Sequence, residues 1–278
     1  MKKIVISGAS GFVGSYLQEY LKDNYAFDTI KRDELNDKET LLQKIEDADV
    51  VINLAGANII HRWSQSYKEL LYSSRIDSTG AISDAINASS SKPMLISTSA
   101  IGIYDTQHEH DEESKAYADD FLSNLCQNWE AQAKKSMGKV AIFRFGVVLG
   151  QGGGALSKML LPFKLGVGGK IGSGAQHFSY IHIEDLARAY KFIIELELEG
   201  TFNLTTPNPT TNLGLTKALG KALTRPTLFP VPEFAMKMIY GEGATVLTDG
   251  QKVIPTRLVE AGFDFKFKTI EEVLENLV

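Results

Sequence analysis

Three glycines near the start of the chain have the spacing of a phosphate-binding turn. They follow the apolar run 4–6, and an amphipathic pattern continues through residues 16–21. Such a strand, turn and helix would direct free backbone N–H groups and a partial positive charge at a pyrophosphate. A glycine-rich turn without a ligand is the alternative, but the expected strand before it and helix after it favour a dinucleotide site. The expected contacts are Gly8, Ser10, Gly11, Phe12, Val13 and Gly14.

Two cations follow the second expected strand, residues 27–30. Proteins that prefer NAD place an acidic residue at this point, whereas proteins that prefer NADP place basic residues there. This chain has Lys31 and Arg32, and Arg32 could bind a 2′-phosphate through two hydrogen bonds. Asp33 and Glu34 weaken the local field, and a solvated surface pair is the alternative. The pattern favours NADP(H) over NAD(H).

These residues need a parallel sheet to position them. Apolar runs at 50–56, 94–99 and 139–149 predict buried strands, with helical patterns between them. The interval 34–49 has room for a short extended piece and one helix, 38–45, so a third strand is expected to be vestigial. Leu54, Ala55 and Gly56 end one run and leave space for a cofactor at the carboxyl edge. We therefore predict an α/β fold, a Rossmann-type doubly wound parallel sheet with a smaller C-terminal α+β lobe.

The glycine cluster 150–154 marks the place where the chain leaves this sheet. We expect an NADP-binding domain over residues 1–154 and a C-terminal lobe over residues 155–278. The lobe would cover the substrate side of the cleft, and some of its strands would return to the main sheet.

Composition limits the partners and the compartment. A net charge of −5 gives no electrostatic attraction to a polyanion, so neither nucleic acid nor a membrane is expected as a partner. The single cysteine, Cys126, excludes an intrachain disulfide and a cysteine-built zinc site. No run is long enough to span a membrane, and the first apolar run is too short for a signal peptide. We expect a cytoplasmic protein with a small-molecule substrate, and a homodimer is a candidate assembly.

The motifs resemble a known family. The turn GASGFVG resembles the TGxxGFxG turn of extended short-chain dehydrogenases/reductases, the family of nucleotide-sugar epimerases and dehydratases. NLAG, RW, SR and a Thr within residues 53–79 resemble its atypical branch of epimerase family proteins (YfcH-like), and the tail resembles that branch's C-terminal domain of unknown function. The resemblance implies that Arg75, where ordinary members have Asn, contacts the cofactor. It also implies that Ser99 orients the substrate oxygen and that Ser97, Gly146 and Val147 lie beside the cofactor.

The resemblance fails where the family carries its catalytic pair. The usual chemistry needs a Tyr and, one helical turn later, a Lys that lowers the pKa of the phenol. In the expected helix 117–135, Phe121 and Leu125 stand at the matching positions. Tyr104 is the first candidate for a substitute proton donor and Tyr117 the second. Two functions stay open: an oxidoreductase or epimerase acting on a sugar-nucleotide-like or other carbonyl substrate, or a non-catalytic NADPH-binding, redox-sensing protein.

Two further segments carry candidate site residues. The glycine-rich stretch before residue 180 resembles the substrate-side segment of the family, which would place Lys170, Gln176 and His177 in the cleft. The loop 108–113 carries residue types that bind divalent cations. Nothing in the sequence fixes their geometry, so we expect a solvated loop and no metal.

Overall fold

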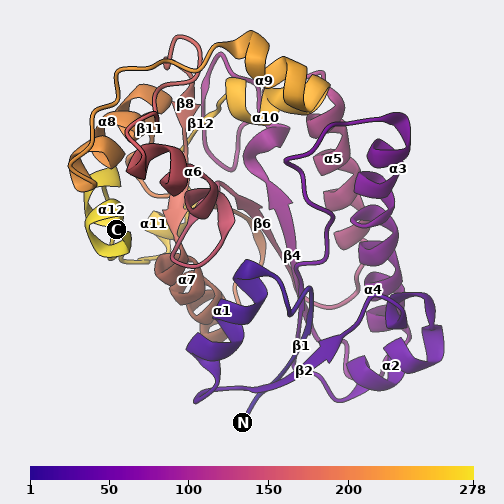
Figure 1. Cartoon of the computed structure of the whole chain (residues 1–278). Coiled ribbons are helices and arrows are strands. Elements are labelled where there is room, and N and C mark those ends of the chain that lie inside the picture. The colour runs from indigo at the N-terminus through magenta and orange to yellow at the C-terminus, as the bar shows by residue number, and fades with distance from the viewer.

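A six-stranded parallel sheet forms the centre of the molecule (Figure 1). The computed structural model describes all 278 residues. The strand order is β10-β6-β4-β3-β1-β2, and every neighbouring pair is parallel. The six strands are β1 (Lys3–Ser7), β2 (Ala26–Ile30), β3 (Val50–Asn53), β4 (Met94–Ala100), β6 (Val140–Phe145) and β10 (Gly200–Leu204). The predicted doubly wound parallel sheet is confirmed.

The sheet has no third strand of the usual arrangement, so β2 is an edge strand. Between β2 and β3 the chain forms only the short helix η1 (Glu34–Asn36) and α2 (Lys38–Glu46). The side chain of Asp37 caps α2 by accepting hydrogen bonds from the backbone N–H groups of Glu39 and Thr40. The short interval had predicted this loss.

Helices cover both faces of the sheet (Figure 1). Helices α1 (Phe12–Leu21) and α7 (Ile183–Leu196) pack on one face, where Leu17, Leu186 and Ile193 are fully buried. On the other face lie α2, α4 (Ile76–Ala88) and α5 (Phe121–Ala133). Helix α3 (Gln65–Ser73) directly precedes α4 in the chain. The two apolar layers hold the sheet rigid, so the loops at its carboxyl edge have a fixed platform.

The order of the strands reverses beside β1. Ser7, the last residue of β1, pairs with Ile30 of β2 on one side and with Asn53 of β3 on the other. The chain runs from β1 to β2 on one side and from β3 to β4 on the other, so these two connections leave the sheet edge in opposite directions. In open α/β sheets this is the place where ligands bind, outside the carboxyl ends of the strands.

The remaining elements form a lobe above that edge. Its core joins α6 (Gly154–Lys164), α8 (Asn212–Ala222) and α12 (Ile270–Leu277). The predicted strand 139–149 is broken at Gly146 into β6 and β7, and β7 pairs with β9 of the lobe. The other elements are η2 (Ile101–Ile103), β5 (Glu109–His110), β7 (Val147–Leu149), β8 (His177–Phe178), β9 (Tyr180–His182), β11 (Thr210–Thr211), α9 (Glu233–Tyr240), η3 (Gly241–Ala244), α10 (Thr245–Thr248), β12 (Lys252–Val253) and α11 (Thr256–Glu260).

No helix combines the length and the apolar character that a membrane-crossing segment needs.

Candidate functional site

The turn between β1 and α1 is packed too tightly for side chains at two of its glycines. Gly8 has a φ of +73°, and a Cβ there would lie 2.8 Å from the backbone carbonyl of Leu54. A Cβ on Gly14 would lie 2.4 Å from the carbonyl oxygen of Gly8. The turn is therefore pressed against the end of β3 and against the first turn of α1.

The third glycine, Gly11, faces open space. Its only neighbour within 4 Å of a built Cβ is the carbonyl oxygen of Gly8, at 3.2 Å. Gly11 is the N-cap of α1 and no side chain caps this helix. The N–H groups of the first turn, from Phe12 and Val13, therefore have no side-chain acceptor. Together with exposed Ser10 they form a cradle that fits an anionic diphosphate.

The ring of Phe12 turns away from this cradle and into the glycine cluster. A Cβ on Gly153 would lie 2.3 Å from the ring, and one on Gly150 or Gly154 would lie 2.8 Å from it. The sequence assigned Phe12 to the cofactor. In the structure only the backbone N–H of Phe12 is placed to contact a cofactor. Its ring packs against the glycine cluster and so joins the phosphate turn to the start of the lobe.

Lys31 and Arg32 lie directly beyond the end of β2, one step after the residue that pairs with Ser7. Both side chains are exposed, and neither forms an ion pair. Glu34 accepts a hydrogen bond from the backbone N–H of Lys31 at 2.7 Å and pairs with Lys44 at 3.0 Å. These hydrogen bonds lower the pKa of Glu34 and hold its carboxylate in place. The cation pair beside the turn fits a ribose phosphate.

The end of β3 is held by a chain of buried hydrogen bonds. Asn53 Oδ1 accepts from the Ser7 hydroxyl at 2.6 Å and from the backbone N–H of Ala55 at 3.2 Å. Its Nδ2 donates to Thr79, which also accepts from the indole N–H of Trp129. Leu54, Ala55 and Gly56 follow at the carboxyl edge, as the sequence predicted for a strand end, and Asn53 fixes their direction.

Arg75 points its guanidinium at this same strand end. It donates to the carbonyl of Ala57 at 2.9 Å, stacks over the ring of Trp129 at 5.3 Å, and lies 3.2 Å from where a Cβ on Gly56 would be. No carboxylate pairs with it, and burial lowers its pKa. An isolated cation at the cofactor edge is suited to an anionic or polar ligand group.

The other predicted cofactor neighbours lie in the middle of the same edge. Ser97 pairs with Asn53 of β3 and Ile142 of β6, and its buried hydroxyl has no hydrogen-bond partner. A Cβ on Gly146 would lie 2.8 Å from the carbonyl oxygen of Ser179. The backbone N–H of Val147 donates to that same oxygen at 2.9 Å. Gly146 and Val147 therefore tie the main sheet to the lobe.

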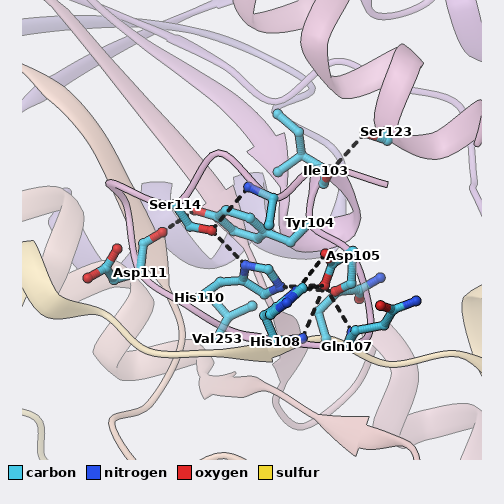
Figure 2. Close-up of polar contacts among 12 residues, drawn as sticks. Ile103, Tyr104, Asp105, Gln107, His108, His110, Asp111, Ser114, Ser123 and Val253 are labelled. Atoms are coloured by element: carbon cyan, nitrogen blue, oxygen red, sulfur yellow. Dashed lines mark hydrogen bonds and ion pairs between the residues drawn. The ribbon is translucent and has the colours of Figure 1, made fainter. Parts of the chain in front are cut away.

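Tyr104, the predicted proton donor, is buried and its hydroxyl is bonded within the protein, which disfavours that role. Its side chain is fully buried, and its ring stacks on His110 with the ring centroids 4.6 Å apart. Figure 2 shows the two side chains beside each other. Its hydroxyl donates to the carbonyl of Asp111 at 2.9 Å and accepts from Arg144 Nη1 at 2.6 Å. Burial raises the pKa of Tyr104 to about 12, although Arg144 opposes the shift. This phenol is a structural group.

Ser99 is also committed to an internal partner. It is 1% exposed, and its hydroxyl donates to Glu130 Oε1 at 2.9 Å. Glu130 forms a two-pronged ion pair with Arg144, with N–O distances of 2.7 and 2.8 Å. Although burial acts to lower it, the bonds and charge of Glu130 raise the pKa of Arg144. The oxygen of Ser99 can still accept a hydrogen bond, but its proton is already engaged.

Helix α5 meets Ser99 with Cys126 and Glu130. Phe121 and Leu125, which stand where the family has Tyr and Lys, pack instead with Trp63. Burial raises the pKa of the Cys126 thiol to about 12, which leaves it unreactive. Neither of these faces of α5 carries a Tyr and a Lys, so the family's catalytic pair is missing whichever face is compared.

Tyr117 lies outside α5, which starts at Phe121 with Asp120 as its cap. Instead it forms an isolated β-bridge with Tyr104, and its hydroxyl accepts from Arg144 at 3.4 Å. The prediction that this helix begins at Tyr117 is therefore wrong. A hydrogen-bonded bridge across the loop has replaced the first turn of the expected helix.

The histidine-rich loop forms bonds within itself. The carboxylate of Asp105 lies 2.8 Å from His108 Nδ1 and 3.2 Å from His110 Nε2, and it accepts from the backbone N–H of Gln107 (Figure 2). His110 is fully buried. No group of three ligating side chains is arranged to hold a metal ion.

The predicted substrate-side residues lie together in the lobe. Lys170 Nζ donates to the carbonyl of Ser173, and the amide of Gln176 donates to the carbonyls of Ile171 and Leu247. His177 lies in β8, where burial lowers its pKa. None of the three forms a hydrogen bond with Ser99 or with the phosphate turn. The amide of Gln176 joins its loop to α10.

Sequence reasoning missed the pair Glu130 and Arg144. Its signal was available, because a charged residue inside the buried run 140–145 needs a partner of opposite charge. What the sequence could not give was the partner's location on α5. The pair now explains why Ser99 and two tyrosines lie around one buried guanidinium.

Comparisons with known proteins agree with this geometry. The family model described as the NAD dependent epimerase/dehydratase family matches residues 4–205, and a domain of unknown function, DUF1731, matches residues 231–277. The chain is 36% identical to the chloroplastic epimerase family protein SDR39U1 homolog of Arabidopsis thaliana, over 99% of this chain and 86% of that protein.

Two solved structures extend the comparison. The human epimerase family protein SDR39U1 (isoform2), solved with NADPH, has a TM-score of 0.92 and 32% identity over 99% of this chain and 98% of its own. The nucleoside-diphosphate sugar epimerase from Corynebacterium glutamicum has a TM-score of 0.77 and 27% identity. It is matched over 98% of this chain and 57% of its own.

Proposed function

The chain belongs to the NAD dependent epimerase/dehydratase family, and on that basis we propose that it binds NADP(H) at the carboxyl edge of its sheet. The observation that carries the proposal is the cradle at Gly11, an uncapped helix N-terminus beside an unpaired pair of cations. The human relative solved with NADPH supports the choice of cofactor. When bound, the cofactor would supply or accept a hydride.

The residues of this chain would divide the binding task. The backbone of the phosphate turn would hold the diphosphate, and Lys31 and Arg32 would hold the 2′-phosphate. Gly56, with Ala55, would lie under the ligand, and Arg75 would supply a cation beside it. Ser97, Gly146 and Val147 would form the floor at the nicotinamide end.

Substitution of Arg32 tests the cofactor preference. An Arg32→Ala variant should lose about 10- to 100-fold in NADPH affinity, because charge-assisted hydrogen bonds to the phosphate are removed. NADH affinity should change little, because NADH lacks that phosphate. Fluorescence titration of both cofactors measures the two losses, with Lys38→Ala, an exposed lysine on α2, as the matched control. Equal losses for NADPH and NADH would argue against a 2′-phosphate site.

For the chemistry, the geometry favours a protein that holds NADPH without the usual proton transfer. Ser99 and Tyr104 are buried and bonded internally, and no Tyr and Lys face them from α5. Retention of the cradle with loss of the proton donor is what an NADPH-binding, redox-sensing protein would have. The proposed compartment is the cytoplasm, because a chain with one cysteine has no internal disulfide that would need an oxidising compartment.

The second candidate is an oxidoreductase or epimerase acting on a sugar-nucleotide-like or other carbonyl substrate. It is favoured by the match to the nucleoside-diphosphate sugar epimerase. In this case Ser99 would accept a hydrogen bond from the substrate, and a group brought by the substrate or solvent would donate the proton.

A turnover assay separates the two candidates. We expect purified protein to bind NADPH and to show no substrate-dependent loss of NADPH absorbance with sugar nucleotides, ketones or aldehydes. A Tyr104→Phe variant should bind NADPH as tightly as the wild type but melt at a lower temperature, since Arg144 loses an acceptor. Turnover that disappears in Ser99→Ala and in Tyr104→Phe would instead establish the enzyme and restore Tyr104 to the site.

A further inference from the structure

Two segments of the lobe carry a charge opposite to that of the whole chain. Residues 151–176 and 207–240 contain seven basic side chains and one carboxylate, Glu233, in a protein of net charge −5. None of the seven forms an ion pair within the molecule. They are Lys158, Lys164, Lys170, Lys217, Lys221, Arg225 and Lys237.

The same segments expose large apolar side chains. Each of eight leaves 55 to 77% of its surface in solvent: Leu161, Leu165, Val167, Leu228, Phe229, Phe234, Met238 and Ile239. Helix α9 has no buried residue. Side chains exposed to this extent do not line an enclosed cleft, so they are poorly placed to hold a small substrate.

Backbone contacts bring these elements side by side. The guanidinium of Arg225 donates to the carbonyl of Lys164, and Val231 exchanges backbone hydrogen bonds with Lys170 and Gly172. At the other end of α8, Asn212 accepts from the backbone N–H of Ile171. The stretch 164–172 therefore lies between α8 and the segment 225–233 that leads into α9.

Within each helix, basic and apolar side chains share a face. Lys158, Leu161 and Leu165 are spaced three and four residues apart along α6 and its end, and all three are exposed. Leu213, Lys217 and Lys221 repeat the arrangement on α8, and Phe234, Lys237 and Met238 repeat it on α9. We call these exposed side chains, with those of Lys164, Val167 and residues 225–229, the basic apolar surface.

We propose that the basic apolar surface binds peripherally to an anionic lipid bilayer. Amphipathic faces that mix lysine with large apolar side chains lie at the boundary between headgroups and acyl chains, where cations meet the anionic headgroups. The sequence predicted no membrane partner because the net charge of the whole chain is −5. That sum does not show that the basic side chains are concentrated on this surface.

Other occupants fit less well. Two copies joined symmetrically through this surface would bring the same basic groups face to face, which disfavours a homodimer here. Nucleic acid would satisfy the cations but would leave the leucines and valine without apolar partners. An anionic bilayer satisfies both groups at once.

Co-sedimentation of the full chain with vesicles tests the proposal. We expect pelleting with vesicles of phosphatidylcholine and phosphatidylglycerol, and at least ~10-fold weaker partitioning with phosphatidylcholine alone or at high salt. Lys158→Glu with Lys164→Glu should weaken partitioning by ~10-fold or more, since each basic residue near an anionic surface contributes about fivefold. Phe229→Ser with Phe234→Ser should weaken it to a similar extent through lost apolar burial.

Two matched variants serve as controls. Met137→Ser removes an equally exposed apolar side chain, and Lys38→Glu reverses an exposed cation, both outside the surface. Both should pellet as the wild type does, and all variants should keep the wild-type melting temperature. Wild-type protein that stays in the supernatant with anionic vesicles, or surface variants that pellet as well as the controls, would overturn the proposal. The proposal would also be overturned if the wild type does not bind vesicles but forms a dimer in sedimentation equilibrium, and if Phe229→Ser with Phe234→Ser dissociates that dimer.

Discussion

A Gly11→Val variant is expected to lose NADPH binding while it keeps its fold. Gly11 has φ −73° and ψ 168°, an extended conformation that any residue adopts. A Cβ there would touch only the carbonyl oxygen of Gly8, at 3.2 Å, so the folded chain needs little adjustment. The branched side chain would project into the space in front of the first turn of α1, where the diphosphate is proposed to lie. NADPH affinity should fall at least ~100-fold, which is about 2.8 kcal/mol, and fluorescence titration measures it.

A matched substitution in the same turn should behave differently. A Cβ on Gly14 would lie 2.4 Å from the carbonyl oxygen of Gly8, inside the packed turn. Gly14→Val should therefore lower both the melting temperature and NADPH binding, whereas Gly11→Val should leave the melting temperature near that of the wild type. Wild-type NADPH affinity in Gly11→Val would place the cofactor elsewhere and would remove the basis of the proposed function.

The parts of this site that are formed by contiguous residues were predictable from the sequence. A strand, three spaced glycines and a helix are contiguous in the chain, so the turn at Gly8 and Gly11 could be predicted without knowledge of its partners. A vestigial third strand was predictable for the same reason, because residues 34–49 leave room for only a short extended piece beside one helix. The position of Lys31 and Arg32 just beyond β2 was predictable as well, because the end of that short strand can be recognised in the sequence.

The parts that depend on distant residues were not predictable. Whether Tyr104 faces the cleft is decided by Arg144, forty positions later on a different strand, and by Asn203 on β10. The sequence also does not show which face of α5 meets Ser99. In the structure that contact is made by Glu130. Periodicity gives the faces of a helix but not the strand or loop that each face meets.

Glu130→Ala is expected to be among the most destabilising single substitutions in the chain. Glu130 and Arg144 are each 3% exposed, so removal of the carboxylate leaves a buried guanidinium without a counter-charge and Ser99 without its acceptor. Breaking a buried pair in this way costs about 3–5 kcal/mol in the free energy of unfolding. Urea unfolding measures the loss. Glu195→Ala, which removes a half-exposed partner of Lys191, should cost under about 1 kcal/mol.

Replacement of both partners separates the charge from the fold. Glu130→Leu with Arg144→Met should be much less destabilising than Glu130→Ala, because a well-packed apolar pair needs no counter-charge. If the pair acts only on stability, the double variant should bind NADPH as the wild type does, because neither residue contacts the phosphate turn. A double variant that is stable but no longer binds NADPH would show that the ion pair positions Ser99 for the cofactor. A Glu130→Ala variant as stable as Glu195→Ala would show that the guanidinium finds another partner in the interior.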